Sequence, residues 1–426
     1  MRTVFGIAIL TAGFCALPRF ALAQGRSPDA LSEHWVATWT TAQQLAAVNF
    51  GGRAGPPPRA RREGPEVSNL PATFSDQTVR MVARVALGGR RVRVELSNMI
   101  NAQPLEIGAA HIGVHKGGGA IAEGTDRVMT FGGNPTFTIP PGVLAVSDPV
   151  DLDVAPLSDL AVSLYFPHDT GAPTSHTVGL HTGYISKGNV TGASTMPDPT
   201  IMFAYAWLTG IDVVAPPDAF TVAALGDSIT DGYATTRDAD RAWPTLLAKR
   251  LNANGAARVA VVNQGISGNQ VLRDGAGFSA LARLDRDVLS RPGVKWVILL
   301  EGINDINIRG RTDGPNALTS DELIWGYRQI VARSHAHGIK VLGATIMPDE
   351  GVPTASERGE EIRQVVNRWI RAKGNFDAVV DFDSVVRDPQ RPVRVKAEFD
   401  PGDHIHPNDI GNQAMADAFD LKVFQN

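Results

Sequence analysis

Four short polar motifs in the second half of the chain carry residue types that could form a nucleophile, donors for an oxyanion and an acid–base pair. In chain order they contain Ser228, Gly268, Asn304, and the pair Asp403 and His406. A serine hydroxyl becomes nucleophilic when an imidazole takes its proton, and a carboxylate holds that imidazole in the required tautomer. Amide N–H groups stabilise the negative charge that then develops on a carbonyl oxygen. The motifs therefore predict attack by a serine on a carbonyl group.

Each motif taken alone also has an ordinary structural explanation. Ser228 could cap a helix, Gly268 could provide a left-handed turn, and Asn304 could belong to a turn after a strand. The occurrence of all four motifs in one chain favours a catalytic site. His404 competes with His406 as the base, but it lies only one residue from Asp403. We expect His406 to pair with Asp403, because a spacing of three lets two side chains meet within one turn.

The elements that would position these residues alternate between strands and helices from about residue 218 onward. Hydrophobic stretches predict strands over 220–225, 258–263, 294–300, 339–345 and 378–382. Helices are expected over 241–252, 278–290, 320–337, 356–372 and 409–419. Such alternation predicts a parallel sheet covered by helices on both faces. The first three motifs follow the first three strands, at the edge of the sheet where sites form in such folds.

The chain before this region has a different pattern. Short stretches of alternating polar and apolar residues occur at 79–85, 91–96, 105–114, 160–166 and 177–185, and 35–40 has similar alternation. Turn residues separate them, which is typical of an antiparallel sandwich or jelly roll. Pro216-Pro217 marks the boundary, giving an N-terminal β-domain over 24–217 and a second domain over 218–426. The Gly/Pro/Arg-rich stretch near 51–65 predicts a solvated loop, with a cationic flap as the alternative.

The first 23 residues fit a secretory signal peptide. Arg2 precedes a short apolar run, and Ala21-Leu22-Ala23 fits a cleavage site. The run is too short to span a bilayer, so we expect cleavage after Ala23 and a secreted or periplasmic protein. Cys15, the only cysteine, lies in this segment, and the mature chain is therefore expected to have no disulfide and no thiolate ligand. The net charge of −4 gives no general attraction to nucleic acid.

Together the four motifs resemble those of the SGNH hydrolases, also called the GDSL esterase/lipase family. Gly226-Asp227-Ser228 matches the first motif, Gly268 the second, Asn304 the third, and Asp403 with His406 the last. The resemblance covers about 210 residues, from about 218 to the end. It implies a flavodoxin-like three-layer α/β/α domain that hydrolyses carboxylic esters through an acyl-serine. The N-terminal half is similar to that of secreted bacterial members with an added β-domain.

The resemblance also implies a role for each site residue. Ser228 would be the nucleophile, His406 the base and Asp403 the residue that orients it. The oxyanion hole would consist of the Ser228 and Gly268 amides with the Asn304 side chain. No cofactor and no metal are expected.

The resemblance predicts a secreted serine esterase acting on short-chain or aryl esters. An alternative is a carbohydrate O-acetylesterase acting on acetylated polysaccharide, because an appended β-sandwich is a common way to present a glycan. A non-catalytic glycan-binding protein is the alternative of a different class, and Ser228, Asp403 and His406 argue against it. Acyl transfer to an acceptor other than water would use the same residues. The expected partner is a small-molecule ester or an acetylated glycan, with no nucleic acid, no membrane span and the oligomeric state left open. The β-domain is expected to be dispensable for the chemical step.

Overall fold

A computed structural model describes residues 33–45, 69–253 and 258–425. The predicted signal peptide over 1–23 and the Gly/Pro/Arg-rich stretch near 51–65 lie outside these ranges. None of the helices in the described ranges is both long enough and apolar enough to cross a lipid bilayer.

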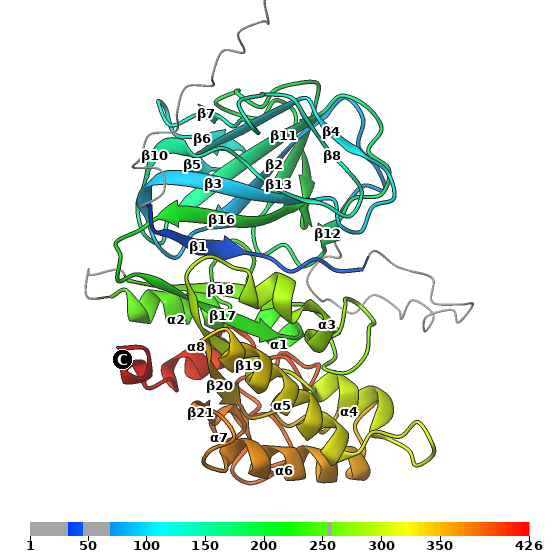
Figure 1. Ribbon diagram of the computed structural model, residues 1–426. Helices are drawn as coiled ribbons and strands as arrows, with labels where there is room; N and C mark the ends of the chain where they lie inside the picture. The colour runs from blue at the N-terminus through cyan, green and yellow to red at the C-terminus, as the bar shows by residue number, and fades with distance from the viewer. Residues whose placement is uncertain (1–32, 46–68, 254–257, 426) are drawn as a thin grey trace, which may run out of the picture. The chain divides into compact units, whose positions relative to one another are not determined.

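The N-terminal part contains two antiparallel sheets (Figure 1). The first has the order β1-β16-β3-β10, with β9 on β3, and consists of β1 (Trp35–Thr40), β3 (Gly89–Ser97), β9 (Leu144–Val146), β10 (Val150–Val154) and β16 (Leu208–Val214). The second has the order β14-β13-β2-β11-β5-β6, with β7 on β5, and consists of β2 (Gln77–Arg84), β5 (Ala109–Gly117), β6 (Ala120–Ile121), β7 (Arg127–Val128), β11 (Asp159–Phe166), β13 (Gly183–Lys187) and β14 (Thr200–Met202). Two short pairs complete this part: β4 (Leu105–Ile107) with β8 (Phe137–Ile139), and β12 (Ser175–His176) with β15 (Tyr205–Ala206).

Alternation in the sequence explains these strands. In β3, Val92, Val94 and Leu96 are buried, whereas the charged residues between them remain partly exposed. The prediction of an all-β region is confirmed.

The stretch 177–185 is not one strand, as its alternation suggested, because 177–182 forms a loop between β12 and β13. Backbone amides of this loop donate to partners outside any sheet, such as the Gln44 side chain for Thr177 and the Asp238 side chain for Thr182.

The C-terminal part contains one five-stranded parallel sheet with the order β18-β17-β19-β20-β21. Its strands are β17 (Phe220–Gly226), β18 (Val259–Gly265), β19 (Val294–Leu300), β20 (Lys340–Ala344) and β21 (Ala378–Val380). All five predicted strands are present, with ends shifted by no more than about two residues. The order, written in chain sequence as 2-1-3-4-5, is that of flavodoxin-like folds. The predicted three-layer α/β/α fold is therefore confirmed.

Helices connect and cover these strands. They are α1 (Ser228–Asp231), α2 (Trp243–Leu251), α3 (Ala280–Leu284), the π-helical turn η2 (Asp285–Leu289), α4 (Ile303–Arg309), α5 (Ser320–Ala336), α6 (Glu357–Arg371), α7 (Phe382–Val386), α8 (Asp409–Asp417) and the 3₁₀ turn η3 (Leu421–Gln425). Right-handed crossovers place α2 on one face of the sheet and α3, α5 and α6 on the other. α8 contacts α2, and α5 contacts both α3 and α6. The five predicted helices are present, whereas α1, α4 and α7 were not predicted.

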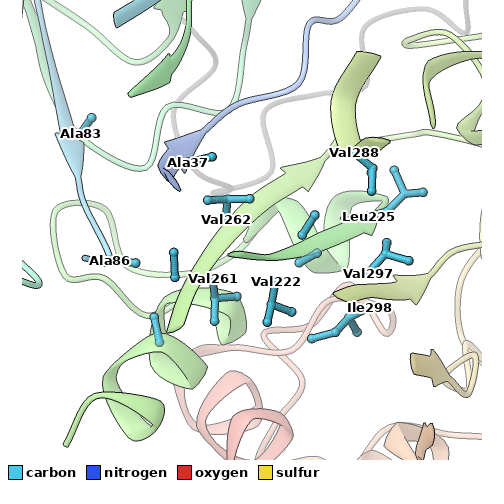
Figure 2. Packing of buried hydrophobic residues seen from close by; sticks show 14 of the residues in the cluster. Ala37, Ala83, Ala86, Val222, Leu225, Val261, Val262, Val288, Val297 and Ile298 are labelled. Atoms are coloured by element: carbon cyan, nitrogen blue, oxygen red, sulfur yellow. The ribbon is translucent and has the colours of Figure 1, made fainter. Parts of the chain in front are cut away.

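One buried apolar cluster includes side chains from both parts of the chain. Figure 2 shows side chains of β17, β18 and β19 in this cluster, together with Ala37 of β1. Hydrogen bonds join the same strand to the α/β part: the Ala37 amide donates to Pro292 O at 2.9 Å, and Thr221 Oγ1 donates to Ala37 O at 2.8 Å. The β1 strand is therefore held by both parts.

Candidate active site

The predicted site residues follow the carboxyl ends of three adjacent strands. Ser228 comes after β17, Gly268 after β18 and Asn304 after β19. The chain moves from β17 to one side for β18 and then to the other side for β19. Ligands of open parallel sheets bind at such a reversal, beyond the carboxyl ends of the strands.

Ser228 is the first residue of the short helix α1 and is 7% exposed. The Asp227 side chain caps this helix by accepting from the Ile229 amide at 3.0 Å. The turn before it requires glycine at 226, because a Cβ there would lie 2.1 Å from Thr230 Oγ1 and 2.7 Å from Leu300 O. The strand therefore ends in a tight turn that presents the serine at the edge of the sheet.

His406 bridges Asp403 and Ser228. Its Nδ1 lies 2.7 Å from Asp403 Oδ2, and its Nε2 lies 2.8 Å from Ser228 Oγ. Asp403 Oδ1 also accepts from the amides of Ile405 and His406. Burial alone would raise the pKa of Asp403, but the hydrogen bonds and charge of His406 and these amides lower it below its ordinary value. Asp403 is therefore an ionised acceptor that holds the imidazole toward Ser228.

His404, the competing histidine, pairs with a different carboxylate. Its Nδ1 lies 2.6 Å from Asp400 Oδ2. Its backbone has a φ of 68°, which is in the left-handed region. Among the described residues, the side chain recorded in contact with Ser228 Oγ is that of His406. The spacing argument therefore selected the histidine that faces the serine.

Gly268 lies in the loop after β18, and Asn304 lies in the first turn of α4, which contacts that loop. Asn304 Nδ2 donates to Asn269 O, next to Gly268, at 2.8 Å, which uses one of its two amide hydrogens. Gly268 has a φ of 81°, a conformation that favours glycine. Asp305, also in α4, joins the helix to the same loop by accepting from the amides of Val271 and Leu272. The structure thus places one predicted oxyanion donor in the loop after β18 and the other at the start of α4, which contacts this loop.

Residues 224–414 match the model of the GDSL-like lipase/acylhydrolase family. This part of the chain belongs to that family. The matched region contains Ser228, Gly268, Asn304, Asp403 and His406, and we refer to it as the GDSL domain.

Solved structures that resemble the chain cover about half of it. They include a lipase/acylhydrolase from Enterococcus faecalis (22% identity, 48% of this chain and 94% of the other, TM-score 0.37). A variant of an acetyl xylan esterase from Geobacillus stearothermophilus has the same values. An aryl esterase from M. smegmatis has 19% identity and a TM-score of 0.37 and covers 49% of this chain and 98% of its own. No curated protein matches the chain.

Arg283 is a residue of the GDSL domain that sequence reasoning missed. Its buried guanidinium donates to Gly226 O at 3.0 Å, Gln264 O at 2.7 Å and Asn269 Oδ1 at 2.9 Å. Arg283 thereby joins the turn before Ser228 to the loop that carries Gly268. An arginine among the apolar residues of α3 was the sequence signal that could have pointed to it.

Three carboxyl groups that follow the carboxyl ends of β17 and β19 are buried: Asp227, Glu301 and Asp305. Burial raises the pKa of Asp227 to about 7 and that of Asp305 to about 6, against the lowering effect of the backbone amides that donate to them. Burial and the neighbouring carboxylate of Asp227 raise the pKa of Glu301 well above its ordinary value.

Within the described ranges, one set of side chains has the proximity of metal ligands. Candidate ligand atoms of Asp159, His181 and Asp240 lie within 4.8 Å of one another. Arg84 Nε lies 2.8 Å from Asp159 Oδ1 and 2.9 Å from Asp240 Oδ2. The guanidinium therefore already supplies a positive charge to these carboxylates, and the set does not include Ser228 or His406.

Proposed function

We propose that this protein is a serine esterase that hydrolyses short-chain or aryl carboxylic esters through an acyl-serine intermediate. The observation that carries the proposal is the continuous hydrogen-bonded series Asp403–His406–Ser228, with 2.7 Å and 2.8 Å between the bonded atoms. A serine used only as a helix cap would not need a histidine at its hydroxyl, nor a carboxylate behind that histidine.

In the first step, Ser228 Oγ attacks the ester carbonyl carbon while its proton moves to His406 Nε2. The Asp403 carboxylate accepts from Nδ1–H and stabilises the imidazolium that forms. The resulting tetrahedral intermediate collapses as His406 gives the proton to the leaving alcohol. The acyl group then remains on Ser228.

The negative charge on the former carbonyl oxygen requires donors that are in place beforehand. We assign this role to the amides of Ser228 and Gly268 and to the Asn304 side chain. Fixed donors of this kind stabilise the transition state because they need not reorganise during the reaction. The hydrogen bonds between α4 and the loop after β18, from Asn304 Nδ2 to Asn269 O and from the Val271 amide to Asp305 Oδ2, support this assignment.

In the second step, a water molecule attacks the acyl carbon. His406 takes a proton from this water and returns one to Ser228 Oγ as the acid leaves. None of the charges that develop in these two reaction steps requires a metal or a cofactor. We therefore expect activity to survive treatment with EDTA and to be lost after reaction with a serine-directed organophosphate.

Acyl specificity is part of the proposal. Ile308 lies one helical turn after Asn304 on α4, so both residues lie on the same side of that helix, and Ile308 is 60% exposed. An exposed apolar side chain beside an oxyanion donor can contact a small acyl or aryl group. A carbohydrate O-acetylesterase would use the same series of residues, with the β-domain in contact with the glycan.

The test compares p-nitrophenyl acetate, butyrate and octanoate with acetylated xylan, using the purified protein and a Ser228→Ala control. We expect the acetate and butyrate esters to be hydrolysed fastest, and the control to lose several orders of magnitude in kcat. A higher kcat/KM for release of acetate from xylan would assign the protein to the O-acetylesterase class. A folded protein that hydrolyses no ester but binds glycan would overturn the proposal.

A further inference from the structure

A histidine of the β-domain contacts the GDSL domain next to the proposed oxyanion loop. His176, in β12, is 3% exposed. Its Nδ1 lies 2.7 Å from Ala42 O, and its Nε2 lies 2.8 Å from Asp231 Oδ1. Asp231 is the last residue of α1, the helix that Ser228 begins. The contact therefore joins the β-domain to the helix of the nucleophile.

The partners of the His176 ring determine its charge. A backbone carbonyl and a carboxylate can both only accept, so each ring nitrogen must carry a hydrogen. Burial alone would lower the pKa of His176, but the charge and hydrogen bond of Asp231 outweigh this effect and raise it above the ordinary value. These contacts favour the imidazolium form of His176, paired with a buried carboxylate.

The second oxygen of the same carboxylate holds the loop after β18. Asp231 Oδ2 accepts from the Ser267 amide at 2.9 Å and from Ser267 Oγ at 2.7 Å. Ser267 directly precedes Gly268. One carboxylate therefore connects His176 with the residue before a proposed oxyanion donor.

The packing around Asp231 leaves little freedom for this connection to shift. A Cβ on Gly265 would lie 2.2 Å from the Asp231 amide nitrogen and 2.5 Å from its Cα. Asp231 is itself only 3% exposed. A buried carboxylate that loses its cationic partner is strongly destabilised, and it must either move or take up a proton. Either change alters the hydrogen bonds to Ser267.

We propose that His176 is a positioning residue through which the β-domain, by way of Asp231, holds the Ser267–Gly268 turn in its oxyanion-binding geometry. This inference rests on the proposed esterase function. It replaces the expectation from sequence that the β-domain is dispensable for the chemical step.

The main test uses His176→Gln with p-nitrophenyl acetate as the substrate. We expect kcat to fall about 10- to 100-fold while KM changes less than about threefold, because a misplaced oxyanion donor weakens binding of the transition state rather than of the ester. The double variant His176→Gln/Asp231→Asn replaces the ion pair by two amides that can still bond to each other, to Ala42 O and to Ser267. We expect its kcat to exceed that of His176→Gln.

The matched control is His34→Gln. His34 is another β-domain histidine that contacts the α/β part, with Nε2 2.8 Å from Ala219 O, just before the amino end of β17 and away from Ser228. We expect kcat within about twofold of wild type. If folded His176→Gln retains kcat as His34→Gln does, the inference is overturned while the esterase proposal stands. If the wild-type protein hydrolyses no ester, the proposed function itself fails.

Ser267→Ala provides a test that does not depend on the folding of the His176 variant. It removes the bond from Ser267 Oγ to Asp231 without changing the β-domain. We expect a several-fold fall in kcat at unchanged KM. In the double variant His176→Gln/Ser267→Ala, the fall in kcat should be smaller than the product of the falls in the two single variants. Wild-type kcat in Ser267→Ala, or simple multiplication of the two effects, would contradict the connection.

Discussion

Two aspartate–histidine pairs lie side by side in the loop before α8, and only one of them reaches Ser228. Asp403 with His406 forms the proposed catalytic pair, and Asp400 with His404 forms the other. The His406 ring also packs against Tyr233, with ring centroids 4.5 Å apart. The residues are similar in type, so their roles depend on which ring the fold directs toward the serine.

Substitution of the two histidines distinguishes their roles. We expect His406→Ala to reduce kcat on p-nitrophenyl acetate by at least about 10³-fold, because the serine then lacks its base. His404→Ala should retain activity within about tenfold and lose some stability with its Asp400 bond. The measurement is kcat for both purified variants, with circular dichroism to confirm folding. An inactive His404→Ala beside an active His406→Ala would show that the base is misassigned.

Asp227 predicts how stability depends on pH. Its pKa is about 7 in the folded protein, against an ordinary value of 3.8, so the folded state binds the proton more tightly than the unfolded state does. This group therefore lowers the free energy of unfolding as the pH rises from about 4 to about 7, by an amount on the order of a few kcal/mol. Asp227→Asn retains an oxygen to cap α1 but cannot ionise. The free energy of unfolding of Asp227→Asn, relative to that of wild type, should therefore increase between pH 5 and pH 8.

Urea unfolding of Asp227→Asn and wild type at both pH values measures this difference. Asp321→Asn, which changes an exposed carboxyl on α5, is the matched control. Its free energy of unfolding should differ from that of wild type by the same amount at pH 5 and at pH 8. An equal stability difference at pH 5 and pH 8 for Asp227→Asn would show that the Asp227 carboxyl does not titrate in this range.

At the scale of elements, the connection from β19 to α4 depends on one glycine. Gly302 has a φ of 112°, and a Cβ there would lie 2.7 Å from Tyr327 Oη and 3.1 Å from Leu323 Cδ2. Tyr327 Oη in turn donates to Glu301 O at 2.6 Å. The first turn of α4 carries Asn304. The position of this proposed oxyanion donor therefore depends on how closely α5 approaches the loop at Gly302.

Replacement of Gly302 by alanine should affect both stability and catalysis. Gly338→Ala, just beyond the end of α5, is the matched control: Gly338 also has a positive φ, of 70°, but a Cβ added there would meet no neighbouring described atom within 4 Å. We expect the control to lose about 1–2 kcal/mol, the cost of the left-handed conformation alone, with kcat unchanged. Gly302→Ala should lose more stability and at least about tenfold in kcat. If Gly302→Ala and Gly338→Ala lose the same stability in urea unfolding and have the same kcat, the close contact of Gly302 with Tyr327 and Leu323 does not have the proposed role.

At the scale of the whole molecule, the contacts of residues His34–Asn426 group them as one compact unit. The buried apolar cluster includes side chains from the β-sheets and from the parallel sheet. Unfolding of one part would expose the apolar surface that covers the other. The two parts should therefore depend on each other for stability.

Thermal unfolding should accordingly be one cooperative transition. We expect a single calorimetric peak, and a loss of the helical signal at 222 nm, which arises mainly from the α/β part, that coincides with it. Ser228→Ala is a suitable control, since it changes the site without changing this contact. Two separated transitions, with the helical signal lost in only one of them, would show that the β-domain and the GDSL domain unfold independently.

Local sequence determined much of this protein. Five apolar stretches predicted the five parallel strands, because strands buried on both faces need continuous hydrophobic residues. Gly226-Asp227-Ser228 and the spacing of Asp403 and His406 predicted the contacts among Ser228, His406 and Asp403, because tight turns and helix caps are encoded by neighbouring residues. The short helices α1, α4 and α7 escaped prediction because they have too few residues for a helical period to appear.

Contacts between distant residues were decided only by the tertiary structure. Arg283 bonds to Gly226 and Gln264, and His176 reaches Asp231 across 55 positions of the chain. No local sequence pattern predicts such partners, because a buried arginine or histidine must bond to polar groups that only the folded chain brings close to it. For the same reason, the sequence suggested a dispensable β-domain, whereas the structure places one of its histidines behind the proposed oxyanion loop.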